Sequence, residues 1–147
     1  MGLAQYLQPN RIATDVEAES KAAALRVLAK LLVAGDDTLS EAAVLEVLLA
    51  REQLASTGVG SSVAIPHGRV GGLDEVRAAM AIVRSGVDFD AIDGEPVHIL
   101  VAIIAPKERP SQHLKVLADV SRLLRRPPVR AGLIQVADPE AAFELIR

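Results

Sequence analysis

One histidine of this sequence lies in a setting that suits nucleophilic chemistry. His67 stands between Pro66 and Gly68 in the stretch AIPHG, directly after an apolar run. Pro66 has a fixed φ and restricts the residue before it, so the backbone that leads to the ring is stiff. Gly68 allows a sharp turn and adds no side-chain bulk. Because imidazole titrates near neutral pH, its neutral form is available as a nucleophile. From this stretch alone, a turn histidine without a chemical role is an equally good interpretation.

Four other residues could form an anion site around that ring. Gly58 and Gly60, in the stretch STGVG, could present backbone N–H groups to an anion. His113 lies at the start of a predicted helix, where unpaired N–H groups attract anions and disfavour a protonated imidazole. Arg51 carries a guanidinium fork that matches a phosphate group. Taken alone, His113 is better interpreted as a surface residue, and Arg51 as an ordinary cation at a helix C-terminus.

The sequence offers little to other kinds of site. No two of the three histidines are spaced i, i+2 or i, i+4, and there is no HExxH motif, so we expect no metal site. The chain has no cysteine, which excludes a thiol nucleophile, and no GxSxG motif of a serine hydrolase. The remaining histidine, His98, alternates with Val97 and Ile99 in an apolar run and is expected to be structural.

Composition indicates one globular domain over residues 1–147, which is close to the commonest domain size. Half of the residues are hydrophobic but only 2% are aromatic, so the core must consist mainly of alanine, valine, leucine and isoleucine. A net charge of −3 argues against a nucleic-acid partner, which usually requires a clustered basic face. No signal peptide is visible, and no apolar run reaches the roughly 20 residues that span a bilayer. We therefore expect a cytoplasmic protein that is not inserted into the membrane.

Apolar patterns predict helices that alternate with strands. Four helices are expected to begin near residues 20, 40, 110 and 138, and the Pro127-Pro128 pair is expected to end the third. Nearly continuous apolar runs at 78–83 and 97–105 suit buried strands, with a hairpin signal at Asp93-Gly94 between them. Residues 63–65 are expected to be extended, 56–60 a loop and 133–136 a short edge strand. The predicted fold class is α/β: a single domain with a mixed β-sheet flanked by helices.

Several blocks of sequence resemble one known family. The stretch TGVGSSVAIPHG, residues 57–68, resembles the active-site segment of enzyme IIA domains of the fructose/mannitol type. These domains belong to the bacterial phosphoenolpyruvate-dependent phosphotransferase system. REQL at 51–54, FDAIDGEPV at 89–97 and SQHLKVLA at 111–118 resemble the arginine-containing lead-in and the second and third signatures of the family. The chain departs at Ser61 and Ser62, where relatives often carry asparagine or glycine.

The resemblance implies a fructose/mannitol-type IIA fold and a role for each candidate residue. His67 would be the phosphorylated histidine, His113 the second active-site histidine, and Arg51 the cationic partner. Phosphate would be bound by Arg51, Gly60 and His113, and no cofactor would be needed. The phosphoryl donor would be the histidine phosphocarrier protein HPr or its nitrogen-branch counterpart. Because such encounters are transient, we expect a modest apolar patch near His67; its predicted members are Val59, Val63 and Val70.

Three roles remain open within this resemblance. The short N-terminal segment and the sequence FDAID look closer to the nitrogen-regulatory branch, in which a free-standing IIA component regulates other proteins through its phosphorylation state. We therefore expect that role. The first alternative is a sugar-specific IIA component that passes phosphate to a IIB domain for uptake. The second is a phosphorylation-sensitive binding module without onward transfer.

Overall fold

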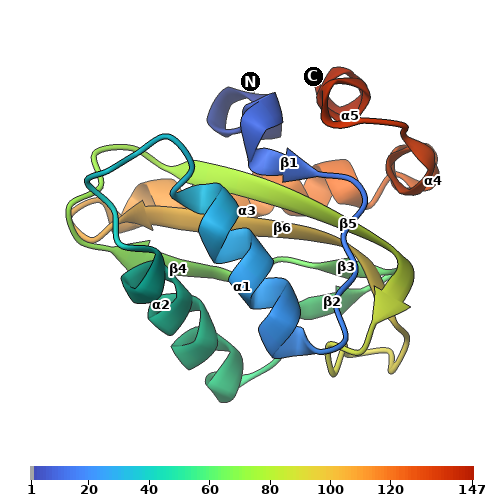
Figure 1. Cartoon of the computed structure of the whole chain (residues 1–147), viewed down its shortest axis with the longest axis horizontal. Coiled ribbons are helices and arrows are strands. Elements are labelled where there is room, and N and C mark those ends of the chain that lie inside the picture. The colour runs from blue at the N-terminus through green and yellow to red at the C-terminus, as the bar shows by residue number, and fades with distance from the viewer. Residues whose placement is uncertain (1) are drawn as a thin grey trace.

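A six-stranded mixed sheet forms the centre of the structure (Figure 1). The computed structural model describes residues 2–147. The strand order is β1-β5-β6-β3-β2, and β4 pairs with β6 beside β3. The strands are β1 (Ile12–Ala13), β2 (Gly58–Gly60), β3 (Val63–Ala64), β4 (His67–Val70), β5 (Arg77–Val87) and β6 (Val97–Pro106). The pairs β5–β6 and β2–β3 are antiparallel, whereas β1 runs parallel to β5, and β3 and β4 run parallel to β6. The predicted mixed sheet is confirmed.

Helices cover both faces of this sheet. On one face lie α1 (Lys21–Leu32) and α2 (Glu41–Leu54), seen in front of the strands in Figure 1. The other face is covered by α3 (Pro110–Leu124), α4 (Pro127–Gln135), α5 (Pro139–Ile146) and the 3-10 turns η1 (Leu3–Tyr6) and η2 (Pro9–Arg11). The site described below lies where these two layers approach β4.

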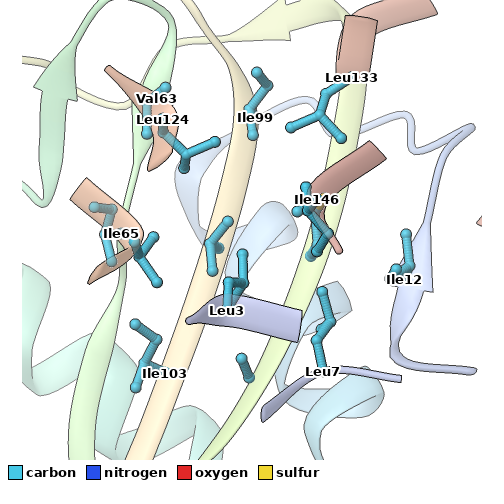
Figure 2. Close-up of a cluster of buried hydrophobic side chains, with 14 of the residues drawn as sticks. Leu3, Leu7, Ile12, Val63, Ile65, Ile99, Ile103, Leu124, Leu133 and Ile146 are labelled. Atoms are coloured by element: carbon cyan, nitrogen blue, oxygen red, sulfur yellow. The ribbon is translucent and has the colours of Figure 1, made fainter. Parts of the chain in front are cut away.

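Two apolar cores result from the alternation of side chains along the buried strands. In β6, Ile99, Val101 and Ile103 belong to the core under α3, whereas Leu100, Ala102 and Ile104 belong to the core under α1 and α2. Figure 2 shows the first of these cores, in which Val63 and Leu124 lie close together. Strands buried on both faces need continuous apolar runs, which explains why the two central strands were predictable.

The four predicted helix starts are confirmed, three of them by side-chain caps, whereas α3 begins at Pro110 without one. The hydroxyl of Ser20 accepts a hydrogen bond from the backbone N–H of Ala23, and that of Ser40 accepts one from Ala43, each at 3.1 Å. The carboxylate of Asp138 accepts from Ala141 at 2.8 Å. Each cap satisfies a donor that the first turn of a helix leaves unpaired.

Three local predictions were wrong. Residues 133–136 do not form a strand, because Val129 and Leu133, four residues apart, are buried on one face of α4. The Pro127-Pro128 pair begins this helix, where proline is well tolerated, and α3 already ends at Leu124. Residues 58–60 are not a loop but the strand β2, whose register with β3 is irregular between Gly58 and Gly60.

Candidate active site

His67 is the first residue of β4 and lies opposite Ile103 of β6. Its ring is half-buried, and its Nδ1 atom lies 2.8 Å from the carbonyl oxygen of Ile65. A carbonyl oxygen only accepts hydrogen bonds, so in the neutral ring this contact assigns the proton to Nδ1. The lone pair of the neutral ring is therefore on Nε2. The intervening Pro66 fixes the short connection between the ring and its acceptor.

His113 lies in the first turn of α3 and meets His67 edge to face. The ring centroids are 5.0 Å apart and the ring planes make an angle of 82°. The Nε2 atom of His113 is buried and has no hydrogen-bond partner within residues 2–147. Because a buried polar atom without a partner is costly and uncommon, this nitrogen indicates a position for a ligand.

Both histidines have a pKa below the ordinary value of 6.5. For His67, burial is the main cause and the charge of Arg51 adds to it, while the Ile65 carbonyl and the charge of Glu52 act in the opposite direction. For His113, burial again comes first, followed by the charges of His67, Arg69 and Arg51. Lowering the pKa keeps both rings neutral at neutral pH, so Nε2 of His67 is available to attack an electrophile.

Two arginines supply positive charge to this region. Arg51 lies in the last turn of α2, half-buried, and donates one hydrogen bond of 2.9 Å to the Ala55 carbonyl. Its charge adds to burial in lowering the pKa of both histidines. Arg69, an exposed residue of β4, lowers the pKa of His113 as well. The structure thus brings together the three residues predicted as catalytic and adds Arg69, which sequence reasoning missed.

Gly68 has a different role from the one predicted. It does not make a turn but continues β4, with no positive φ. A Cβ atom at this position would lie 2.2 Å from Cγ1 of Val47 in α2. The glycine therefore allows α2 to pack directly against β4. Because Arg51 follows Val47 by about one helical turn, this close approach brings the arginine to the histidine pair.

Backbone N–H groups of the predicted glycine loop already donate hydrogen bonds within the protein. The N–H of Gly58 donates to the hydroxyl of Ser56 at 3.0 Å, and the N–H of Ser61 donates to the Asp93 carboxylate at 3.1 Å. Gly60 has a φ of 94° and lies beside the same carboxylate, which would repel a phosphate group. No contact of the described residues links Gly60 to the histidine pair, so its role in phosphate binding stays a prediction.

The apolar patch differs from the one predicted. Val63 and Val70 face the cores and are buried, and only Val59 is exposed. Three other large apolar side chains are more exposed: Leu54 in the last turn of α2, Ile92 in the loop that hydrogen-bonds to β2, and Leu114 next to His113. We call these four residues, Leu54, Val59, Ile92 and Leu114, the apolar rim.

His98 has the structural setting that was predicted for it. It is half-buried in β6, with Nδ1 3.3 Å from the Ser62 hydroxyl and its ring against Gly86.

Among the described residues, no helix combines the length and the apolar composition that crossing a bilayer requires.

An α/β fold that holds two neutral histidines beside arginines, with one ring nitrogen free to react, defines a class of protein suited to receiving a phosphoryl group. The family model described as "Phosphoenolpyruvate-dependent sugar phosphotransferase system, EIIA 2" matches residues 5–147, so the chain belongs to this family. Its role is that of a IIA phosphocarrier component.

Individual relatives agree with this assignment. The chain is 34% identical over 144 residues to a nitrogen regulatory protein of Pseudomonas aeruginosa, covering 98% of this chain and 94% of the relative. It superposes on the crystal structure of the nitrogen regulatory protein IIA-Ntr from Neisseria meningitidis with a TM-score of 0.89 and 34% identity, covering 98% of both chains. The mannitol enzyme IIA of Escherichia coli, solved in complex with phosphorylated enzyme IIB, has the same fold, with a TM-score of 0.78, 21% identity and 95% and 97% coverage.

Proposed function

We propose that this chain is a nitrogen-regulatory IIA component that accepts a phosphoryl group on Nε2 of His67 from a histidine phosphocarrier protein in the cytoplasm. The observation that carries the proposal is the histidine pair. Nδ1 of His67 is occupied by the Ile65 carbonyl, which leaves Nε2 as the nucleophile. His113, with its unpaired Nε2, is 5.0 Å away between ring centroids and can donate to a phosphoryl oxygen when that atom carries the proton.

The transfer needs no group beyond the donor. The lone pair on Nε2 forms a bond to phosphorus while the nitrogen–phosphorus bond of the donor's phosphohistidine breaks, and its electron pair returns to the donor's ring. The proton on Nδ1 stays in place, so the acceptor ring gains positive charge and the Ile65 carbonyl stabilises it. Charge is spread over three phosphoryl oxygens in the loose transition state. Arg51, Arg69 and His113 are the groups that can stabilise these oxygens.

The regulatory branch is supported by the relatives named nitrogen regulatory protein, which match the chain almost from end to end. The alternative is a sugar-specific IIA component that hands phosphate to a IIB domain; a mannitol IIA of the same fold has been solved in complex with phosphorylated IIB. A binding module without onward transfer is the third role. The sugar-specific role differs from the other two in where the phosphate goes next, so an acceptor assay separates it from them.

The decisive experiment follows radiolabel from phosphoenolpyruvate through the first enzyme of the system and a carrier, either HPr or its nitrogen-branch counterpart. We expect acid-labile label on the chain and none on His67→Ala, with His98→Ala as the matched control. His113→Ala should be labelled more slowly with an unchanged fold. Undiminished labelling of His67→Ala would refute the proposal. Candidate IIB domains are then added: label that stays on the chain supports regulation, whereas label that moves on supports sugar uptake.

The apolar rim is the surface we expect the carrier to contact. Leu54, with 82% of its surface exposed, and Ile92, with 83%, are the most exposed large apolar residues that the structure describes. Because solvated apolar side chains suit a small, transient interface, Leu54→Ser and Ile92→Ser should raise KM for the carrier and leave kcat nearly unchanged. Leu145→Ser, on α5, is the control. An unchanged KM in both rim variants would exclude this surface.

A further inference from the structure

Glu52 is a buried carboxylate that the mechanism above does not use. It follows Arg51 in the last turn of α2, and its side chain is only 4% exposed. Burying a charge is costly unless the charge is paired and hydrogen-bonded. Glu52 is one of only three buried polar or charged residues among residues 2–147, with Thr14 and Thr57. The contacts that compensate this burial therefore indicate what the residue does.

The carboxylate of Glu52 joins three segments of the chain. It accepts a hydrogen bond of 3.0 Å from the backbone N–H of Thr57 and another from the Thr57 hydroxyl. Lys21, the first residue of α1, forms an ion pair with it at 3.1 Å and a second one with Asp90 at 3.2 Å. The ammonium group also lies 5.1 Å from the centre of the Phe89 ring. Glu52 thus fixes the segment that enters β2 against both helices.

A continuous path of hydrogen bonds leads from this carboxylate to the reactive ring. Thr57 donates to Glu52, and the carbonyl of Thr57 accepts from the backbone N–H of Ile65 at 3.0 Å. The carbonyl of Ile65 in turn accepts from Nδ1 of His67 at 2.8 Å. Each residue of the path is held by the one before it, so the position of the acceptor that fixes the tautomer of His67 depends on Glu52.

We propose that Glu52 is a positioning residue for phosphoryl transfer, which aligns the His67 ring through Thr57 and Ile65 while Lys21 and Thr57 compensate its buried charge. This proposal rests on the proposed function of His67. The charges that act on His67 are those of Arg51 and Glu52, both from α2, and the ring of His113 from α3 meets it edge to face. Glu52 is the negative group among them. It also opposes the arginine when the ring gains positive charge during transfer.

Glu52→Gln tests the proposal, because it keeps the shape of the side chain and removes the charge. We expect kcat for phosphoryl uptake to fall about tenfold, as for the loss of one charge-assisted hydrogen bond, with KM for the carrier unchanged because the buried residue cannot touch a partner. Glu52→Asp should recover part of the rate. In an NMR titration, the pKa of His67 should fall further below 6.5 in Glu52→Gln, since a negative charge that raised it is gone.

Two further variants keep the test independent of folding. Thr57→Val retains the carboxylate and the backbone hydrogen bond but removes the hydroxyl. We therefore expect a smaller loss of kcat than in Glu52→Gln, and a His67 pKa that does not fall further. Glu46→Gln, an exposed acid of α2, is the matched control. A Glu52→Gln protein of lower melting temperature but with unchanged kcat and His67 pKa would overturn the proposal. The NMR titration needs no phosphoryl donor, so it tests the coupling even if His67 proves not to be labelled.

Discussion

The contact between β4 and α2 allows a quantitative test of how the site is assembled. In Gly68→Ala, the new methyl group would lie 2.2 Å from Cγ1 of Val47. Valine in a helix is almost restricted to one χ1 rotamer, and β4 is held by its pairing with β6, so neither side yields easily. The substitution must therefore push α2 away from the sheet. Overpacking of this kind usually lowers the free energy of unfolding by about 1–3 kcal/mol.

This cost can be converted into a melting temperature. With about 2.1 cal/mol/K of unfolding entropy per residue, a chain of this length has an unfolding entropy of roughly 0.3 kcal/mol/K, so the expected decrease is about 3–10 °C. Because α2 carries Arg51, phosphoryl transfer should suffer too: displacement of a positioning group by about 1 Å can slow a reaction by about 100-fold. Thermal unfolding and the labelling assay measure the two effects on the same samples.

Two variants make the interpretation specific. Val47→Ala removes the clashing methyl group, so Gly68→Ala/Val47→Ala should be at least about 1 kcal/mol more stable than the sum of the single changes predicts. Gly71→Ala is the control, because a Cβ atom there would approach only the Lys107 side chain, at 3.9 Å. Additive effects of the two changes, or a melting temperature of Gly68→Ala equal to that of the control, would refute the packing argument.

Three further predictions concern stability. Ser61 has a φ of 56°, so Ser61→Gly should relieve left-handed strain and raise the free energy of unfolding by about 0.5 kcal/mol net of glycine's entropy, measured by urea unfolding. Ser40→Ala should lower it by about 1 kcal/mol, because the N-cap of α2 is lost; an unchanged urea midpoint would contradict this. The lowered pKa values of His67 and His113 mean that the unfolded chain binds more protons, so the stability they contribute is complete above pH 6.5 and is lost as pH falls through their native pKa values. The same unfolding series from pH 8 to pH 5 should show a shallower decline in His67→Gln/His113→Gln, and an identical decline would contradict the assignment.

Most of the secondary structure was predictable because local signals agree with the tertiary packing. The capping residues Ser20, Ser40 and Asp138 mark helix starts, and the buried runs at 78–83 and 97–105 lie within β5 and β6. The segment LIQV at 133–136 failed because a short apolar run does not distinguish a strand from a buried helix turn. There the outcome depends on packing of α4 that the local pattern does not contain.

The reactive residues of the site were predictable from the sequence, but the residue that positions them was not. His67 was marked by its neighbours, and His113 and Arg51 followed from the family resemblance. Arg69 could have been found, since it lies two residues after His67 in a strand and such residues share a face. Glu52 gives no comparable signal: it is one of 19 acidic residues, and only the fold reveals that its carboxylate is buried.

The position of β4 in the sheet explains why groups from both helical layers meet at one ring. Within residues 2–147, β4 pairs with β6 alone, so it is an edge strand, and His67 is its first residue. At an edge, α2 approaches from one face with Arg51 while α3 approaches from the other with His113, which a central strand buried on both faces would not allow. Exposed edges invite unwanted pairing, and short length and charge are the usual protection. A four-residue strand that carries Arg69 has both, so the same arginine that protects the edge adds positive charge that acts on His113.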